Sequence, residues 1–191
     1  MRLADLAGQV RDAPARLGGT RLVLVDGPAG SGKTTLAGRL AAELDAPVVH
    51  LDDLYAGWTL DGVVDRLTGW VLDPVAAGRD AVFDAYDWHA GAFRVPTTVP
   101  AGPVLVVEGC GAGAHRVADR ASLLVWVQAP PEVCARRWAD RGGAAMTAFQ
   151  PGWARAEAEV FAREGTRVRA DVRVDGAPAQ DPGPDRVAVL P

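Results

Sequence analysis

The chain has 191 residues, of which 49% are hydrophobic and 23% are charged, a composition typical of one globular domain with a sizeable core. The net charge of −4 argues against a protein that binds nucleic acid or an anionic membrane surface, because such proteins usually carry a basic excess. No apolar run approaches the roughly 20 residues of a membrane span, and the first residues lack the apolar core of a signal peptide, so we expect a cytoplasmic protein.

Hydrophobic periodicity predicts helices that alternate with strands. This alternation predicts an α/β fold with a five-stranded parallel sheet covered by helices on both faces. We expect one domain over residues 1–191, with a loose tail from Ala177 whose end could pair at a sheet edge. The third helix should end near Leu72, because Pro74 restricts the residue before it. The expected helices are residues 3–10, 33–44, 59–72, 130–142 and 151–165, and the expected strands are 21–26, 47–53, 103–109, 122–129 and 170–176, with a further extended segment at 81–88.

A glycine-rich turn, the P-loop (residues 27–35), joins the first expected strand to the next helix. Gly27, Gly32, Lys33 and Thr34 fit G-x-x-x-x-G-K-[ST], the Walker A pattern. In this arrangement backbone N–H groups and a helix N-terminus surround a phosphate, and glycines leave room for it. Lys33, the single lysine in the chain, would reach the β- and γ-phosphates of ATP, and Thr34 would offer its hydroxyl to Mg²⁺. The expected ATP-binding residues are Gly27, Pro28, Ala29, Gly30, Ser31, Gly32, Lys33, Thr34 and Thr35.

The sequence lacks the motifs of two other classes of nucleotide-binding protein. A GTP switch would carry an Asn-Lys-x-Asp guanine reader, but the chain has no asparagine and no second lysine. AAA-type and helicase-type motors usually have a hydrophobic strand that ends in Asp-Glu, together with long additional segments, and the sequence shows neither. The lack of these motifs favours a kinase. A P-loop alone does not define one, so other residues must carry out the phosphoryl transfer.

Acidic residues follow two expected strands, at the sheet edge where a nucleotide binds. Glu108 ends one strand, where it could hold a water on Mg²⁺ or face the acceptor. Asp52 and Asp53 end another. Phosphoryl transfer to a hydroxyl needs a carboxylate that orients the hydroxyl and takes its proton, so one of this pair is the candidate base, with Asp52 preferred. The expected magnesium ligands are Thr34, Asp52 and Glu108.

Four segments resemble the uridine kinase-like branch of the P-loop kinases: VDGPAGSGKTTLA, VVHLDDLY, YDWHAGAF and VLVVEGCGAG, in this order within residues 20–175. That branch includes nucleoside, nicotinamide riboside and pantothenate kinases. The resemblance implies that Asp52 is the base and that Tyr55 completes its motif. It also implies an acceptor site near the Tyr-Asp-Trp segment. The expected substrate-binding residues are Asp53, Tyr55, Tyr86, Asp87, Trp88 and His89.

The acceptor segment departs from the family pattern. Uridine kinases usually follow Tyr-Asp with a His-Thr-Arg-like run, whereas this chain has WHAGAFRVP. His89 and Arg94 could take related parts, and Trp58 and Trp88 could stack on a flat acceptor such as a base. The identity of the acceptor therefore stays open.

The resemblance further implies a lid over roughly residues 136–153, whose arginines neutralise charge on the transferring phosphoryl group. Arg137 and Arg141 lie four residues apart and share a helix face, so we expect one of them to act in catalysis. Gly142 and Gly143 could serve as the hinge of this lid. Closure would exclude water, which competes with the acceptor for the phosphate.

The sequence thus predicts an ATP- and Mg²⁺-dependent kinase that phosphorylates a hydroxyl of a small molecule, above all a nucleoside or ribosyl compound. Two alternatives remain open. The acceptor could be a nucleoside monophosphate or another metabolite, with Arg66, Arg79 or Arg94 near an acceptor phosphate. Alternatively, the chain could be an ATP-binding regulatory protein with incidental turnover. Neither the oligomeric state nor the choice between ATP and GTP follows from the sequence.

Overall fold

The fold comes from a computed structural model that describes residues 1–141 and 146–191 in full and gives residues 142–145 only their place within a helix. The strands are β1 (Arg21–Asp26), β2 (Val48–His50), β3 (Ala81–Asp87), β4 (Ala92–Val99), β5 (Val104–Glu108), β6 (Ala121–Gln128), β7 (Val172–Asp175) and β8 (Ala188–Val189). The helices are α1 (Leu3–Asp12), α2 (Lys33–Leu44), the 3₁₀ helix η1 (Leu51–Asp53), α3 (Val63–Arg66), the π-helix η2 (Leu67–Leu72), α4 (Asp73–Ala76), α5 (His115–Ala118), α6 (Pro131–Thr147), α7 (Gln150–Glu164) and α8 (Thr166–Arg169).

The main sheet confirms the predicted α/β class, with six strands in place of five. Its order is β2-β5-β1-β6-β7-β8. The first five of these strands are parallel, and β8 adds an antiparallel edge beside β7. Parallel strands covered on both faces are apolar at nearly every position, and β1 and β5 are buried almost throughout.

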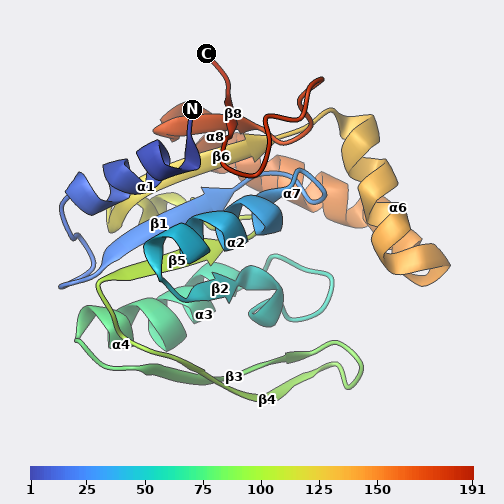
Figure 1. The fold of residues 1–191 in the computed structure, drawn as a ribbon. Helices are drawn as coiled ribbons and strands as arrows, with labels where there is room; N and C mark the ends of the chain where they lie inside the picture. The colour runs from blue at the N-terminus through green and yellow to red at the C-terminus, as the bar shows by residue number, and fades with distance from the viewer.

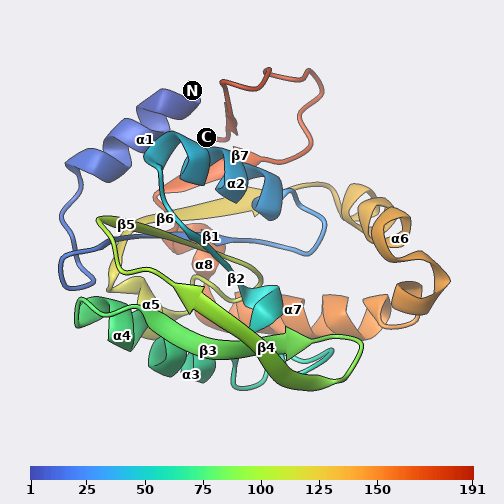
Figure 2. The same ribbon diagram turned by 60° about the horizontal axis from the view of Figure 1, so that its bottom comes forward.

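Alternate residues of each strand divide the core into two layers. Val23 and Val25 of β1 pack against α1 and α2, which cover one face of the sheet (Figure 1). Leu22 and Leu24 point to the opposite face and pack with residues of α3, η2, α5 and α7. Figure 2 brings the β3–β4 hairpin forward and shows it beside α3 and α4 on this second side. None of the helices in the described part of the chain is long and apolar enough to span a lipid bilayer.

A predicted strand and a predicted helix need correction. The second strand ends at His50, and Asp52 and Asp53 lie on η1, where the chain turns away from the sheet. The helix expected over 59–72 begins at Val63 and continues to Ala76. Pro74 does not end it, and the helix continues through this residue directly after the π-helix η2.

The extended segment at 81–88 is one half of a hairpin, because β3 pairs antiparallel with β4 in a separate two-stranded sheet. The sequence analysis missed β4, in which Pro96 interrupts the pattern and most residues are exposed.

The C-terminal tail is attached to the body of the protein instead of being loose. β8 pairs with β7, as the analysis of the last residues anticipated. The Arg39 guanidinium on α2 donates to the carbonyls of Gly183, Pro184 and Arg186. These bonds go to main-chain oxygens, which a composition rich in Pro, Asp and Gly does not reveal.

Candidate functional site

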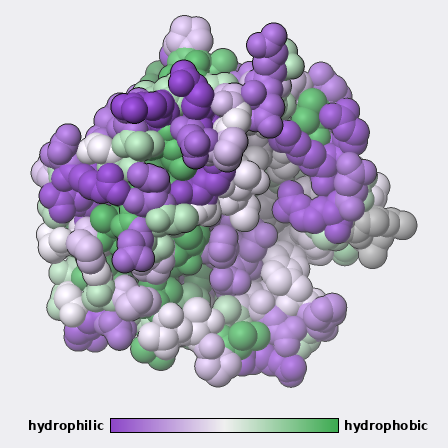
Figure 3. All heavy atoms as spheres, viewed as in Figure 1, coloured by the Kyte–Doolittle hydropathy of each residue, from purple (hydrophilic) through white to green (hydrophobic). Residues whose placement is uncertain are grey.

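A cavity of about 1170 Å³ opens at the carboxyl ends of the parallel strands. Its lining runs from the tail and α2, across the P-loop, to η1, α6 and α7. The surface is hollowed between α6 and the β3–β4 hairpin (Figure 3). A single small-molecule site usually occupies roughly 300–1,000 Å³, so this cavity has room for two ligands side by side.

The P-loop has the backbone geometry that its glycines predict. Gly27, Gly30 and Gly32 all have positive φ, at 145°, 79° and 103°. A Cβ at Gly27 would lie 2.0 Å from the carbonyl oxygen of Val127, and one at Gly30 would lie 2.6 Å from that of Cys134. These positions therefore require glycine both for conformation and for space. The loop leads directly into the N-terminus of α2, where free N–H groups favour an anion.

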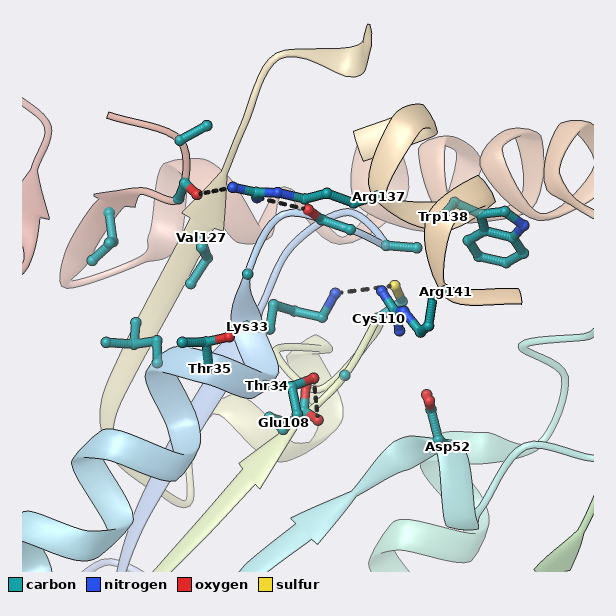
Figure 4. Close-up of a pocket in the computed structure, with 18 of the residues that line it drawn as sticks. Lys33, Thr34, Thr35, Asp52, Glu108, Cys110, Val127, Arg137, Trp138 and Arg141 are labelled. Atoms are coloured by element: carbon teal, nitrogen blue, oxygen red, sulfur yellow. Dashed lines mark hydrogen bonds between the residues drawn. The ribbon is translucent and has the colours of Figure 1, made fainter. Parts of the chain in front are cut away.

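Lys33 stands at the first position of α2 with its side chain buried in the cavity wall (Figure 4). Its Nζ donates to the carbonyl of Pro28 at 2.8 Å and to Cys110 Sγ at 3.6 Å. Burial acts to lower the pKa of Lys33, but the acidic groups around it, Cys110 and Glu108 foremost, raise it above its usual value. The ammonium therefore stays charged beside the P-loop, as phosphate binding needs.

Thr34 and Glu108 meet where magnesium was expected. Thr34 Oγ1 donates to Glu108 Oε1 at 3.0 Å, and His50 Nδ1 lies 2.7 Å from the same oxygen. Burial acts to raise the pKa of Glu108, but the bond with His50 and the charge of Lys33 bring it below its usual value. The hydrogen bond with Glu108 raises the pKa of His50. The sequence analysis did not place His50 in the site, since it lies within a strand.

This pair fits magnesium in the form that P-loop enzymes use. Mg²⁺ is commonly held by one or two carboxylates, several waters and the phosphates of the substrate, so it needs no complete protein cage. The described residues contain no group of three or more His, Cys, Asp or Glu arranged to hold a metal by themselves. A hydroxyl and a carboxylate 3.0 Å apart beside the helix N-terminus are consistent with such a shared site.

The structure separates the two neighbouring aspartates. Asp52 points into the cavity toward Arg141, whereas Asp53 is absent from the cavity lining (Figure 4). Burial and the charge of Glu108 raise the pKa of Asp52, although part of the residue is exposed at the cavity. A raised pKa strengthens a carboxylate as a proton acceptor. The geometry thus supports Asp52 over Asp53.

The two lid arginines differ in their contacts. Arg137 donates to the carbonyls of Gly30 and Gly176, both at 3.0 Å, and so ties α6 to the P-loop and to the end of β7. Both arginines line the cavity, and the charge of Arg141 acts to lower the pKa of Asp52. Because the Arg137 guanidinium is bonded to these two carbonyls, Arg141 is the better candidate of the two to meet a phosphoryl group. The proposed hinge at Gly142 and Gly143 lies outside the fully described residues.

Three of the expected substrate-binding residues line the cavity: Tyr55, Trp88 and His89. Tyr86 and Asp87 do not. Asp87 accepts the backbone N–H groups of His89 and Ala90 and bonds Arg94 at 2.8 Å, so it holds the hairpin turn. Tyr86 packs edge-on against Trp88. Tyr86 and Asp87 therefore do not reach the cavity but contact Trp88 and His89, which do.

A buried carboxylate on α7 joins the lid region to the P-loop, and the sequence analysis missed it. Glu157 Oε2 accepts the N–H of Ala29 at 2.9 Å and the indole N–H of Trp153 at 3.1 Å. The thiol of Cys110 also donates to this oxygen at 3.2 Å. Nothing in the helical pattern around Glu157 marks it, because its partners lie far away in the sequence.

Asp26, the last residue of β1, holds the start of the P-loop by hydrogen bonds. Its carboxylate accepts the N–H groups of Gly27, Gly111 and Gly113 at 2.7–2.9 Å. Burial raises the pKa of Asp26 to about 6, against the effect of these three bonds. Its place at the end of the strand before the Walker A motif was the available signal for this role.

Comparison with known proteins identifies the family. The family model AAA_18, described as an AAA domain, matches residues 23–161. A possible uridine kinase from Bacillus stearothermophilus superposes with a TM-score of 0.67 at 21% identity, over 90% of this chain and 96% of that one. A candidate fructose transport system kinase from Silicibacter sp. TM1040 gives a TM-score of 0.63 at 20% identity, over 86% and 95% of the two chains.

A third likeness is short. The brefeldin A resistance protein of Schizosaccharomyces pombe is 40% identical over 81 residues, which are 42% of this chain and 5% of that protein. The two solved structures confirm the predicted resemblance to uridine kinase-like P-loop kinases at the level of the fold. The family description names an AAA domain, although the sequence lacks the Asp-Glu strand end and the long additional segments expected of AAA-type motors. The chain belongs to the AAA_18 family of AAA domains and has the P-loop kinase fold.

Proposed function

We propose that this protein is an ATP-dependent kinase that transfers the γ-phosphoryl group to a hydroxyl of a small molecule carrying a flat ring. A nucleoside or ribosyl compound is the class that the sequence resemblance favours. One observation supports this proposal above all: a single cavity joins the P-loop to Asp52, with Lys33 and Arg141 between them. A donor phosphate and an acceptor hydroxyl could therefore meet without water between them.

Each residue has a defined part in the proposed transfer. The P-loop N–H groups hold the triphosphate, and Lys33 and Arg141 stabilise the charge on the moving phosphoryl group. Asp52 orients the acceptor hydroxyl and takes its proton. The hydroxyl oxygen then bonds to the γ-phosphorus, while the bond from that phosphorus to the bridging oxygen breaks and ADP leaves. Magnesium, held by Thr34 and Glu108, would neutralise negative charge on the phosphates.

The cavity lining weighs against a nucleoside monophosphate as acceptor. Such an acceptor needs arginines for its own phosphate, yet Arg66, Arg79 and Arg94 do not line the cavity. Of the arginines that do, Arg39 and Arg137 already donate to backbone carbonyls. Arg66 donates to backbone carbonyls of Leu54 and Asp61, and Arg94 bonds Asp87. We therefore favour an acceptor that carries no phosphate.

Dependence on an acceptor separates a kinase from an ATP-binding regulator. Purified protein would be incubated with Mg²⁺ and ATP, and ADP release would be measured with and without each of a panel of nucleosides and small alcohols. We expect one or more acceptors to raise ADP release at least tenfold. The same slow ADP release with every compound, together with tight ATP binding, would favour the regulator.

A further inference from the structure

Six aromatic side chains gather in the cavity beyond Asp52. We call them the aromatic wall: Tyr55, Trp58, Trp88, Trp138, Phe149 and Trp153, all of which line the cavity. Trp58 lies at its centre, with ring centroids 4.8 Å from Trp88, 5.5 Å from Trp138 and 6.1 Å from Trp153. Phe149 stacks on Trp58 at 4.9 Å with an interplanar angle of 13°.

Four of the five polar groups of this wall, all but the indole N–H of Trp58, donate to acceptors within the protein. The indole N–H groups of Trp88, Trp138 and Trp153 donate to Asp52 O, Met146 O and Glu157 Oε2, at 3.0–3.1 Å. The Tyr55 hydroxyl donates to the carbonyl of Cys110 at 3.0 Å. Four of the six side chains therefore present carbon surfaces to the cavity, and their donors are not available to the edge of a ligand.

The wall has a buried part and an exposed part, since Tyr55, Trp138 and Trp153 belong to the buried core whereas Trp88 and Phe149 are open to solvent. Trp88 is 40% exposed and Phe149 is 46% exposed. Exposed aromatic groups in a cavity are typical of binding sites, where flat rings stack on them. Trp88 also bonds the backbone of Asp52, so a ring on the wall would hold its hydroxyl substituent close to that carboxylate.

We propose that the aromatic wall binds the acceptor through the faces of a flat, uncharged ring and not through hydrogen bonds to the edge of that ring. This inference rests on the proposed function and narrows its substrate class. Among the described residues, the other polar groups that line this half of the cavity are Asp52, Arg141, His89 and the indole N–H of Trp58, and the proposed transfer uses the first two at the phosphoryl group. The ring is therefore required, while the polar groups on its edge matter little.

A matched pair of acceptors tests this inference. Phenyl β-D-riboside and methyl β-D-riboside carry the same hydroxyls, and only the first has an aromatic ring. We expect kcat/KM for the phenyl compound within tenfold of those for uridine and cytidine, and at least a hundredfold above that for the methyl compound. Use of uridine with neither simple riboside accepted would show that base-edge hydrogen bonds are needed, and would overturn the inference. Equal use of both ribosides would overturn it too.

Variants of Trp58 test whether the aromatic wall itself binds the acceptor ring. Trp58→Ala should raise KM for ring-bearing acceptors at least tenfold with KM for ATP within twofold, and Trp58→Phe should restore most of the loss. Trp70→Ala is the control, because Trp70 packs on Phe83 and Phe93 away from the cavity and should leave the acceptor KM unchanged. An unchanged acceptor KM in Trp58→Ala would contradict the proposal.

A binding measurement separates this inference from the proposed transfer. Ring-bearing compounds on the wall should quench tryptophan fluorescence, and Trp58→Ala should weaken their binding at least tenfold. Saturable binding of phenyl riboside without acceptor-dependent ADP release would uphold the wall and overturn the kinase proposal. ADP release that depends on methyl riboside, without binding of the phenyl compound, would uphold the kinase proposal and overturn the inference about the aromatic wall.

Discussion

Replacing Glu157 with alanine tests the buried link between α7 and the P-loop. Glu157 is 8% exposed, and its Oε2 accepts N–H groups from Ala29 and Trp153. A buried donor such as the Trp153 N–H costs about 1–3 kcal/mol when it is left without a partner, whereas the half-buried Ala29 lines the cavity and its N–H can bond water, so the expected loss is about 1–3 kcal/mol. Typical domains have a free energy of unfolding of about 5–15 kcal/mol, and a loss of this size would be a large fraction of it.

Urea unfolding monitored by tryptophan fluorescence measures this loss. Glu157→Gln keeps an acceptor oxygen and should lose less stability than Glu157→Ala. Glu159→Ala is the matched control, because Glu159 is an exposed residue of the same helix, and its loss should stay within about 0.5 kcal/mol. A Glu157→Ala protein as stable as the Glu159→Ala control would refute the reasoning.

Three further predictions concern charged groups. Lys33→Ala should abolish transfer and weaken ATP binding at least tenfold by calorimetry; full activity would contradict its place at the phosphates. Asp52→Asn should lower kcat by roughly 10²–10⁴-fold with ATP affinity unchanged. If Asp53→Asn gives this loss and Asp52→Asn does not, the base is Asp53 and the assignment to Asp52 is wrong. Burial acts to raise the pKa of Glu164, but hydrogen bonds from His115 and Arg163 lower it from 4.5 to about 2. The stability that ionised Glu164 adds is present above its unfolded pKa and lost as pH falls toward 2, so the difference in unfolding free energy between wild type and Glu164→Gln should shrink over that window. A difference that is constant with pH would argue against this ion pairing.

The P-loop and its flanking elements could be predicted because their signals are local. An apolar run, glycines at positive φ and a helical repeat each lie within a few residues, and β1 and α2 have the predicted bounds. The ends of the parallel strands likewise placed Glu108 beside Thr34, since parallel strands end at one edge of a sheet.

The rest of the site depends on contacts between distant segments. Glu157 reaches Ala29 across 128 positions, and Arg137 reaches Gly30 across 107. The aromatic wall draws on the loop after η1, the hairpin turn, α6, α7 and the link between these two helices, so no single stretch of sequence displays it. Asp87 is the opposite case, because the family motif places it at the acceptor while its hydrogen bonds in the structure serve the turn.

The account rests on the claim that the P-loop presents a bound triphosphate to Asp52 within one cavity. A crystal structure with Mg²⁺ and a non-hydrolysable ATP analogue tests this claim most directly. We predict that the phosphates lie against the P-loop N–H groups and Lys33, with the γ-phosphate facing Asp52 and Arg141. Triphosphate bound away from the P-loop, or a γ-phosphate turned away from Asp52, would contradict the account.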